Sequence, residues 1–285
     1  IDITSSTQVR ARALEPGLAP GPLDRRLFSK LNPDVLTFES NLPLIVVDTF
    51  GRTTTENWYT LALTRIVDLS GGSARVEDAP NFVGATGLKL RGSSSLQFPK
   101  KQYALETWDV TNDDIDVPLL GFPAESDWIL YGPYTDKSLM RDFLAYRWSN
   151  RIGRYAVRTR FVEVFFDQNG GGVSASDYVG VYILQEKIKE GPHRVDIAPI
   201  DSTDNTLPEV SGGYIIKRDR LDPGDGGFVT SRGVRLAYVY PKESEITLAQ
   251  AAWLQGYIDS FETALYGPAF ADPVTGYAAW IDVDS

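Results

Sequence analysis

The chain has 285 residues, 42% of them hydrophobic and 23% charged, which is the balance of a globular protein built as one large domain or two small ones. It carries 28 Lys and Arg against 38 Asp and Glu, and the net charge of −10 excludes a protein that coats nucleic acid with a basic face, although it allows a local cationic pocket for one phosphorylated ligand. Cysteine is absent, which excludes disulfides, thiolate zinc sites and cysteine nucleophiles, and no run approaches the ~20 apolar residues of a membrane-spanning helix.

Residues 1–35 are rich in Arg, Pro and Gly and lack an apolar period, so we predict an extended arm or interdomain linker there. We assign residues 36–285 to one domain. Within it, residues 42–47 predict a buried strand because they form an apolar run broken only by proline. A second strand is predicted within residues 59–69, whose β-branched and aromatic side chains favour extended backbone.

Residues 88–91 and 102–108 predict two further strands, and the loop between them is a candidate phosphate-binding site. Polyphosphate needs backbone N–H groups that can approach it closely, as glycine allows, with hydroxyls and cations at their edge. The residues that meet this requirement are Arg91, Gly92, Ser93, Ser94, Ser95, Lys100 and Lys101. The loop lacks the Gly-Lys-Ser/Thr of a P-loop, and a polar hairpin turn with solvated lysines explains the same composition.

Residues 136–152 predict a helix that begins with Asp136 as its cap and ends before Gly153. Its predicted apolar stripe consists of Met140, Phe143, Leu144 and Trp148. Near the start of this helix, Arg141 could clamp a carboxylate or phosphate through two N–H groups, or it could form a structural ion pair.

Residues 160–166 and 178–185 predict two strands joined by the glycines at 170–172. Two more extended segments are predicted at 213–217 and 234–240. Because strands and helices are mixed without regular alternation, the predicted class is α+β, with mixed antiparallel sheets and packed helices.

A second helix is predicted over residues 248–265, with Thr247 and Gln250 as a capping box and Gly267 after its end. Its apolar stripe is predicted to be Leu248, Ala251, Leu254, Ile258, Phe261 and Leu265.

Other candidate sites are weaker. His193 is the only histidine, so a multi-histidine metal site is excluded, and no Gly-x-Ser-x-Gly elbow accompanies it for a Ser-His-Asp triad. Asp282 and Asp284 have the spacing of paired metal ligands, but acidic residues before a helix are commonly caps. No metal-binding residue is therefore assigned.

The order of strand, small-residue loop, lysine-bearing strand, helix and paired strands is also that of a protein-kinase amino-terminal lobe. In that arrangement Lys100 or Lys101 contacts the nucleotide phosphates, and Gln185-Glu186-Lys187 lies near the segment that meets adenine. Element order alone is a weak guide to function.

A series of short motifs resembles the spore coat protein H (CotH) family. In chain order they are Leu90-Arg91-Gly92-Ser93-Ser94, Phe98-Pro99-Lys100-Lys101-x-Tyr103, Trp128-x-Leu130, Tyr134-x-Asp136-Lys137-Ser138-Leu139-Met140-Arg141-Asp142, Phe161-Val162-Glu163-Val164-Phe165, Gly180-Val181-Tyr182-x-Leu184-x-Glu186-Lys187-Ile188, Gly212-Gly213-Tyr214-Ile215-x-Lys217, Asp219-Arg220 and Trp280-Ile281-Asp282-Val283-Asp284-Ser285. Each motif is weak alone, and the ordered series is specific.

The resemblance implies an atypical protein-kinase-like fold that uses ATP and a divalent cation such as Mg²⁺ to phosphorylate Ser residues of Ser-rich, Lys/Arg-rich coat proteins. An acidic surface would attract such a substrate. It implies export to the spore coat or cell surface of a bacterium. The nucleotide-binding residues implied are Arg91, Gly92, Ser93, Ser94, Ser95, Lys100, Lys101, Arg141 and Glu186.

One departure from the family concerns the catalytic acids, which we expect after Ser285, in a missing C-terminal segment or a separate chain. The chain starts at Ile1 and its only methionine is Met140, so we expect a trimmed piece of a longer product. Two alternatives stay open: a non-catalytic structural coat protein or surface adhesin with this fold, and a carbohydrate-associated module of an exported enzyme.

Overall fold

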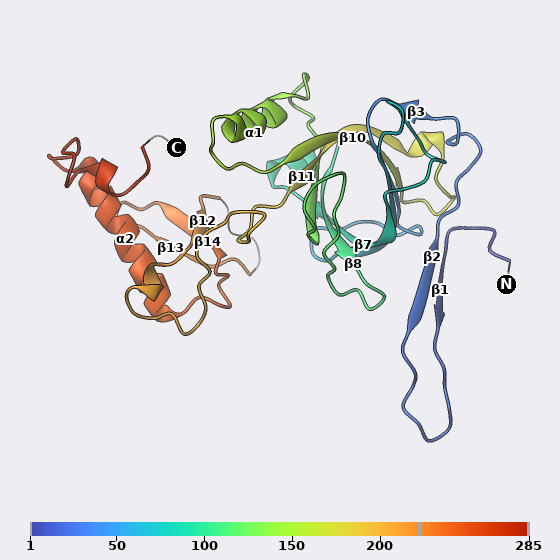
Figure 1. The fold of residues 1–285 in the computed structure, drawn as a ribbon, viewed down its shortest axis with the longest axis horizontal. Coiled ribbons are helices and arrows are strands. Elements are labelled where there is room, and N and C mark those ends of the chain that lie inside the picture. The colour runs from blue at the N-terminus through green and yellow to red at the C-terminus, as the bar shows by residue number, and fades with distance from the viewer. Residues whose placement is uncertain (1, 220, 222–223, 284–285) are drawn as a thin grey trace. The chain divides into compact units, whose positions relative to one another are not determined.

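Seven strands close into a barrel in the computed structural model, which describes residues 2–219, 221 and 224–283 (Figure 1). Their order around the barrel is β10, β11, β9, β8, β7, β5, β4, and the parallel pairing of β4 with β10 closes it. The strands are β4 (Leu44–Asp48), β5 (Thr60–Val67), β7 (Phe82–Arg91), β8 (Gln102–Trp108), β9 (Asp127–Tyr131), β10 (Thr159–Asp167) and β11 (Tyr178–Glu186). The six strand predictions up to residue 185 are confirmed, and β9 is a strand that the sequence did not predict.

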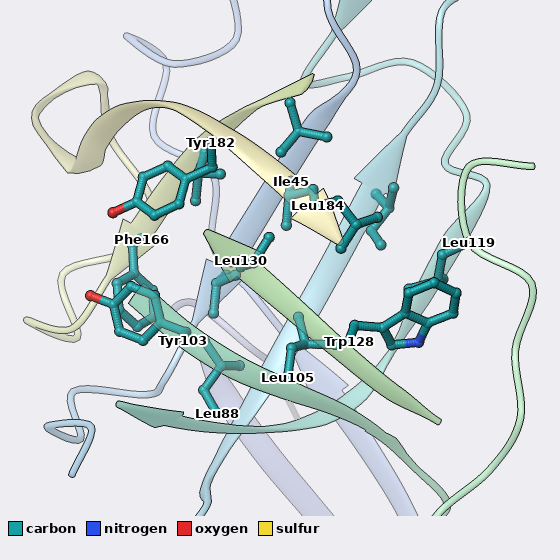
Figure 2. Close-up of a cluster of buried hydrophobic side chains, with 14 of the residues drawn as sticks. Ile45, Leu88, Tyr103, Leu105, Leu119, Trp128, Leu130, Phe166, Tyr182 and Leu184 are labelled. Atoms are coloured by element: carbon teal, nitrogen blue, oxygen red, sulfur yellow. The ribbon is translucent and has the colours of Figure 1, made fainter. Parts of the chain in front are cut away.

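The barrel interior is an apolar core (Figure 2). Along β8 the buried residues alternate with half-buried ones, as a strand with one face toward the core requires. Tyr103 and Leu105 share that buried face. Trp128 of β9 is fully buried, and its ring stacks on Phe122 at 5.9 Å between centroids.

A second apolar cluster covers the outside of the barrel over β4 and β10. Val35, Leu44, Val46 and Phe165 are buried in it, and Phe38 packs against it. The short strands β3 (Glu39–Ser40) and β6 (Ala74–Arg75) pair beside this cluster. We call this side of the barrel the covered face.

The amino-terminal segment forms a hairpin of β1 (Thr7–Ala11) and β2 (Asp24–Phe28) (Figure 1). The sequence predicts an extended arm or linker over residues 1–35, and this hairpin lies within it. Arg25 is buried, and its guanidinium donates to the Asp109 carbonyl and the Asn112 side chain, which fastens β2 to the loop after β8.

Helix α1 (Arg141–Arg151) begins later than predicted, and the predicted start at Asp136 is wrong. Residues 136–140 form a turn instead, because the Asp136 carboxylate accepts hydrogen bonds from the Ser138 hydroxyl and backbone N–H before it accepts from the Arg141 N–H. The predicted apolar stripe is not buried: Met140 is 46% exposed and Trp148 59% exposed.

The chain divides into two compact units, Ile1–Lys187 and Ile188–Ser285. The second unit holds a sheet of β12 (Ile215–Lys217), β14 (Arg235–Tyr240) and β13 (Gly227–Val229), with helix α2 (Leu248–Tyr266). The division falls inside the single domain predicted over residues 36–285, whose boundaries stay a prediction.

Helix α2 has the predicted capping box: Thr247 accepts from the Gln250 N–H, and the Gln250 side chain accepts from the Thr247 N–H. Its predicted stripe is confirmed at Leu254, which is buried, and wrong at Leu248, which is 91% exposed.

Short 3₁₀ helices complete the elements: η1 (Ser94–Gln97), η2 (Ala175–Asp177), η3 (Glu209–Ser211) and η4 (Tyr277–Ala279). Strands thus predominate over a few helices, in agreement with the predicted α+β class. Of the described helices, none combines the length and apolar character needed to cross a bilayer.

Candidate functional site

The small-residue loop after β7 is a tight turn that only glycine can start. Gly92 has φ +128°, a conformation that side chains with a Cβ rarely adopt. A Cβ at this position would lie 2.2 Å from the Ser95 hydroxyl oxygen. The loop then winds into η1, so Ser93, Ser94 and Ser95 are drawn together beside the end of β7.

Both predicted lysines border this loop, and both ammonium groups contact backbone carbonyls. The Lys101 ammonium donates to the Leu96 carbonyl at 2.5 Å, back onto the loop. The Lys100 ammonium donates to the Val181 carbonyl and lies 4.6 Å from the centre of the Tyr182 ring. Burial lowers the pKa of Lys100, and the Glu163 carboxylate opposes that shift.

The turn before α1 lies against the same loop. Phe98 stacks on Tyr134 with 5.2 Å between ring centroids, and the Lys137 ammonium lies 4.3 Å from the centre of the Tyr134 ring. These contacts join two motifs that are far apart in the sequence, the one ending in Lys100-Lys101 and the one from Tyr134 to Asp142.

Arg141 lies at the start of α1 with its side chain 86% exposed, and it forms a 3.7 Å ion pair with Asp136. Hydrogen bonds from the Ser138 hydroxyl and then from the Arg141 N–H lower the pKa of Asp136. The exposure leaves Arg141 in reach of a ligand, while the ion pair matches the structural alternative, so its predicted role stays open.

Asp142, one residue further, is the centre of a half-buried polar cluster. Its carboxylate accepts a hydrogen bond from the Gln185 side chain of β11. Burial raises the pKa of Asp142, while that hydrogen bond and the positive charge of Arg91 at the end of β7 pull it down. The positive charge of Arg91 therefore favours the ionised form of this carboxylate.

Two tyrosines belong to the same cluster. Burial raises the pKa of Tyr146, one turn along α1, and the negative charge of Asp142 adds to the shift. Burial and then Asp142 likewise raise the pKa of Tyr131, the last residue of β9. We call Arg91, Tyr131, Asp142, Tyr146 and Gln185 the α1 cluster.

Glu186 does not join this cluster. Its carboxylate is completely buried, and it accepts from the Arg158 side chain at 2.7 Å and from the Arg158 backbone N–H at 2.8 Å. Since Gln185 and Glu186 are successive strand residues, their side chains point to opposite faces, and only Gln185 reaches Asp142.

Sequence reasoning selected Arg91, Gly92, Ser93, Ser94, Ser95, Lys100, Lys101, Arg141 and Glu186. In the structure Lys101 contacts the serine loop, Lys100 contacts β11, and Arg91 acts on Asp142 at the start of α1. It assigned no role to Asp142, Tyr131 or Tyr146, and it named Gln185 only within the segment predicted to meet adenine. Asp142 adjoins Arg141 in a motif already noted, so its position was a signal. Nothing local marked Tyr131, because only the pairing of β9 with β11 brings it near Gln185.

The donor set does not fit a divalent cation. Among the described residues, no group of three or more His, Cys, Asp or Glu is arranged to hold a metal. The Asp136 and Asp142 carboxylates are engaged by Ser138 and Gln185. Asp284 and Ser285 of the last motif, and Arg220 of an earlier one, lie outside the described residues.

The glycine-rich segment predicted between two strands is a structural connection. The glycines at 170–172 join β10 and β11 in a hairpin, as predicted, and Gly170 has φ +77°. In the second unit, the rings of Tyr214, Trp253 and Tyr257 stack on one another, with 5.7 Å and 5.5 Å between successive centroids. Successive rings therefore contact each other through their faces.

Comparison with known families gives one match: the model described as CotH kinase protein matches residues 88–285. This range contains the small-residue loop, both lysines and the whole α1 cluster. Among curated proteins, no sequence matches the chain.

Proposed function

This chain belongs to the CotH family, and on that premise we propose that it binds ATP for an atypical protein kinase that phosphorylates Ser residues of basic proteins. In this proposal the barrel and α1 act together as the nucleotide-binding lobe of a kinase. In protein kinases a helix packs on the amino-terminal sheet, and an acidic residue of that helix pairs with a sheet cation near the nucleotide phosphates.

The observation that supports the proposal is the position of Asp142. This carboxylate of α1 lies on the outside of the barrel, bonded to Gln185 of β11 and acted on by Arg91 of β7. Arg91 directly precedes the serine loop. An acidic residue of the helix thus interacts electrostatically with a cation next to the small-residue loop, which resembles the helix acid and sheet cation of a kinase.

In this proposal the backbone N–H groups and hydroxyls of residues 92–95 receive the phosphates. Lys100, Lys101 and Arg141 supply positive charge at the edge. The lysines reach the ligand by exchanging their carbonyl partners for phosphate oxygens. Glu186 acts indirectly on the nucleotide site in this proposal, by positioning Arg158 through their ion pair.

ATP enters such sites with Mg²⁺, which neutralises phosphate charge when bound. The donor set of the described residues does not fit that ion, so no step of the proposal passes through it. What these residues would do is bind and orient the phosphates.

The proposed substrate is a Ser-rich protein with many Lys and Arg residues, since a net charge of −10 attracts such chains. The family suggests spore coat association, and we propose an exported protein of the coat or cell surface of a bacterium. Coat or adhesin scaffolding without catalysis would need no ATP site, so nucleotide binding separates the two functions.

The test is a calorimetric titration of the chain with ATP and Mg²⁺. Lys101→Ala is expected to weaken ATP binding by about tenfold or more, because a charged hydrogen bond to phosphate is lost, while the melting temperature stays nearly unchanged. Lys242→Ala is the matched control, since its side chain is 75% exposed and lies in the second unit. Absence of ATP binding would reject the proposal and favour the scaffold, and unaltered affinity in Lys101→Ala would reject the role of that lysine.

A further inference from the structure

A groove of about 330 Å³ runs beside the second half of α1, away from the serine loop. Its apolar lining comes from Phe122, Phe143 and Val157, and its charged lining from Arg147, Arg151 and Arg158. We call it the arginine groove. Nothing in the proposed nucleotide site uses it.

The groove is cationic in a chain that is acidic overall. No acidic side chain is among the described residues that line it. Glu186 engages Arg158 from the buried side, while Arg147 and Arg151 are exposed. Arg160, the next arginine along β10, forms an ion pair with Asp68 and is not part of the lining. The local charge is therefore positive against a background of −10.

The groove walls are held in place before any ligand arrives. The Asn150 amide donates to the Tyr146 and Ala156 carbonyls and accepts from the Ala156 N–H, which ties the end of α1 to the segment that leads into β10. Phe143 packs on Phe161 of β10 at 4.6 Å between ring centroids. A preformed groove costs little ordering entropy on binding.

The same end of α1 exposes large apolar side chains. Trp148 is 59% exposed, Ile152 75% and Tyr155 46%. Exposed Trp and Tyr beside Arg is the composition that carries most binding energy in protein interfaces. The surface therefore offers both charge and apolar contact to a protein partner.

The spacing of the arginines indicates the shape of that partner. Residues four apart on a helix rise by about 6 Å, and side chains two apart on an extended strand are separated by about 6.6 Å. Arg147 and Arg151 thus match carboxylates at alternate positions of an extended chain. We propose that the arginine groove docks an extended acidic segment of a partner protein, with two carboxylates at alternate positions on Arg147 and Arg151 and an apolar side chain at the next position of the same face over Phe122 and Phe143.

A nucleic acid is the less favoured occupant. Its many phosphates need a broad basic surface, and the remainder of this chain repels them. A short acidic segment needs only the few charges that the groove supplies.

The probe is a short fluorescent peptide whose alternate positions carry Glu, Glu and Phe, with Ser at the positions between them, titrated into the full chain. The control peptide carries Lys in place of Glu. The test variant is Arg147→Gln/Arg151→Gln, which keeps long side chains with good helix propensity, and the charge-matched control is Arg12→Gln/Arg52→Gln on other exposed arginines. Circular dichroism melting checks that each variant is folded.

We expect the Glu peptide to bind, the Lys peptide not to bind, and the groove variant to lose about tenfold or more in affinity while the control variant loses none. Binding of the Glu peptide should also weaken with salt. Equal binding of both peptides, no binding of the Glu peptide, or unchanged affinity of a folded groove variant would each overturn the proposal. Tighter binding of an oligonucleotide of the same charge would assign the groove to nucleic acid instead. Because ATP titration is independent of this assay, failure of one leaves the other standing.

Discussion

The two outer sides of the barrel differ in how deeply they bury their carboxylates. On the covered face, Asp48 is fully buried, and its carboxylate accepts from the Ser6 and Ser29 hydroxyls and the Phe50 N–H. On the side beneath α1, no helix residue is buried, and Asp142 remains half-buried with a raised pKa.

The difference separates a face that stabilises the fold from one that keeps charged groups available. β10 serves both faces, because Phe165 packs in the covered cluster while Phe161 contacts Phe143 of α1. A carboxylate that is fully hydrogen-bonded inside the protein has little left to offer a ligand. One that is half-buried, poorly solvated and close to a cation is typical of a functional site.

The largest expected difference in stability is between one alanine substitution on each face. Phe165→Ala should lower the free energy of unfolding by about 3–5 kcal/mol, because Phe165 is fully buried and its ring packs on Phe38 at 4.9 Å and on Tyr178 at 5.3 Å. Trp148→Ala, on the exposed side of α1, should change it by about 0.5 kcal/mol or less. Urea denaturation measures both, and similar losses would contradict the distinction between the faces.

A smaller effect is expected for the buried carboxylate. Asp48→Ala should cost about 2 kcal/mol, since the Ser6 and Ser29 hydroxyls and the Phe50 N–H would lose their acceptor inside the protein. The exposed Asp116→Ala is the control, with almost no expected change in stability. If both variants unfold at the same denaturant concentration, the hydrogen bonds of Asp48 do not stabilise the covered face.

The smallest effect concerns Asp142, where the sign depends on pH. A raised pKa means that the folded state holds the proton more tightly than the unfolded state, so stability falls as pH rises from about 3.9 toward the raised value. The loss persists at neutral pH and is modest, below about 1 kcal/mol, because the group is partly solvated.

Asp142→Asn removes the charge but can still accept from Gln185, so it should be as stable as the original chain at neutral pH, or slightly more stable, and lose the pH slope. Denaturation at a series of pH values measures this. A variant with the same slope as the original chain would show that Asp142 does not titrate as described. A variant markedly less stable at neutral pH would place Asp142 among the structural carboxylates.

The parts predicted well from the sequence depend on neighbouring residues. The apolar run at 42–47 could only be buried as a strand, and Thr247 with Gln250 fixes the start of α2 through bonds between residues three apart. Gly92 was selected for its lack of a side chain, and its conformation requires that lack. The ordered series of motifs indicated the CotH family, and the family match agrees over residues 88–285.

The wrong predictions concern places where alternative hydrogen bonds or packing contacts compete, and the spacing of apolar residues does not reveal which of them forms. Asp136 has the residue type of a helix cap, but Ser138 offers its carboxylate a closer partner and delays the helix to Arg141. The spacing of Met140 and Trp148 predicted a buried stripe. Both residues are exposed, because α1 packs on the barrel through Phe143 and Asp142 instead.

Six of the seven barrel strands, the second helix, the glycine turn and the family could thus be predicted from the sequence, because each is set by residue type within a few positions of the chain. Only the tertiary structure decided which side chains meet. The pairing of β9 with β11 and the placement of α1 outside the barrel bring Arg91, Asp142 and Gln185 together, turn Glu186 inward to Arg158, and line a groove with Arg147 and Arg151. Strand register and packing join residues far apart in the chain, and no local pattern of residue types specifies which ones they are.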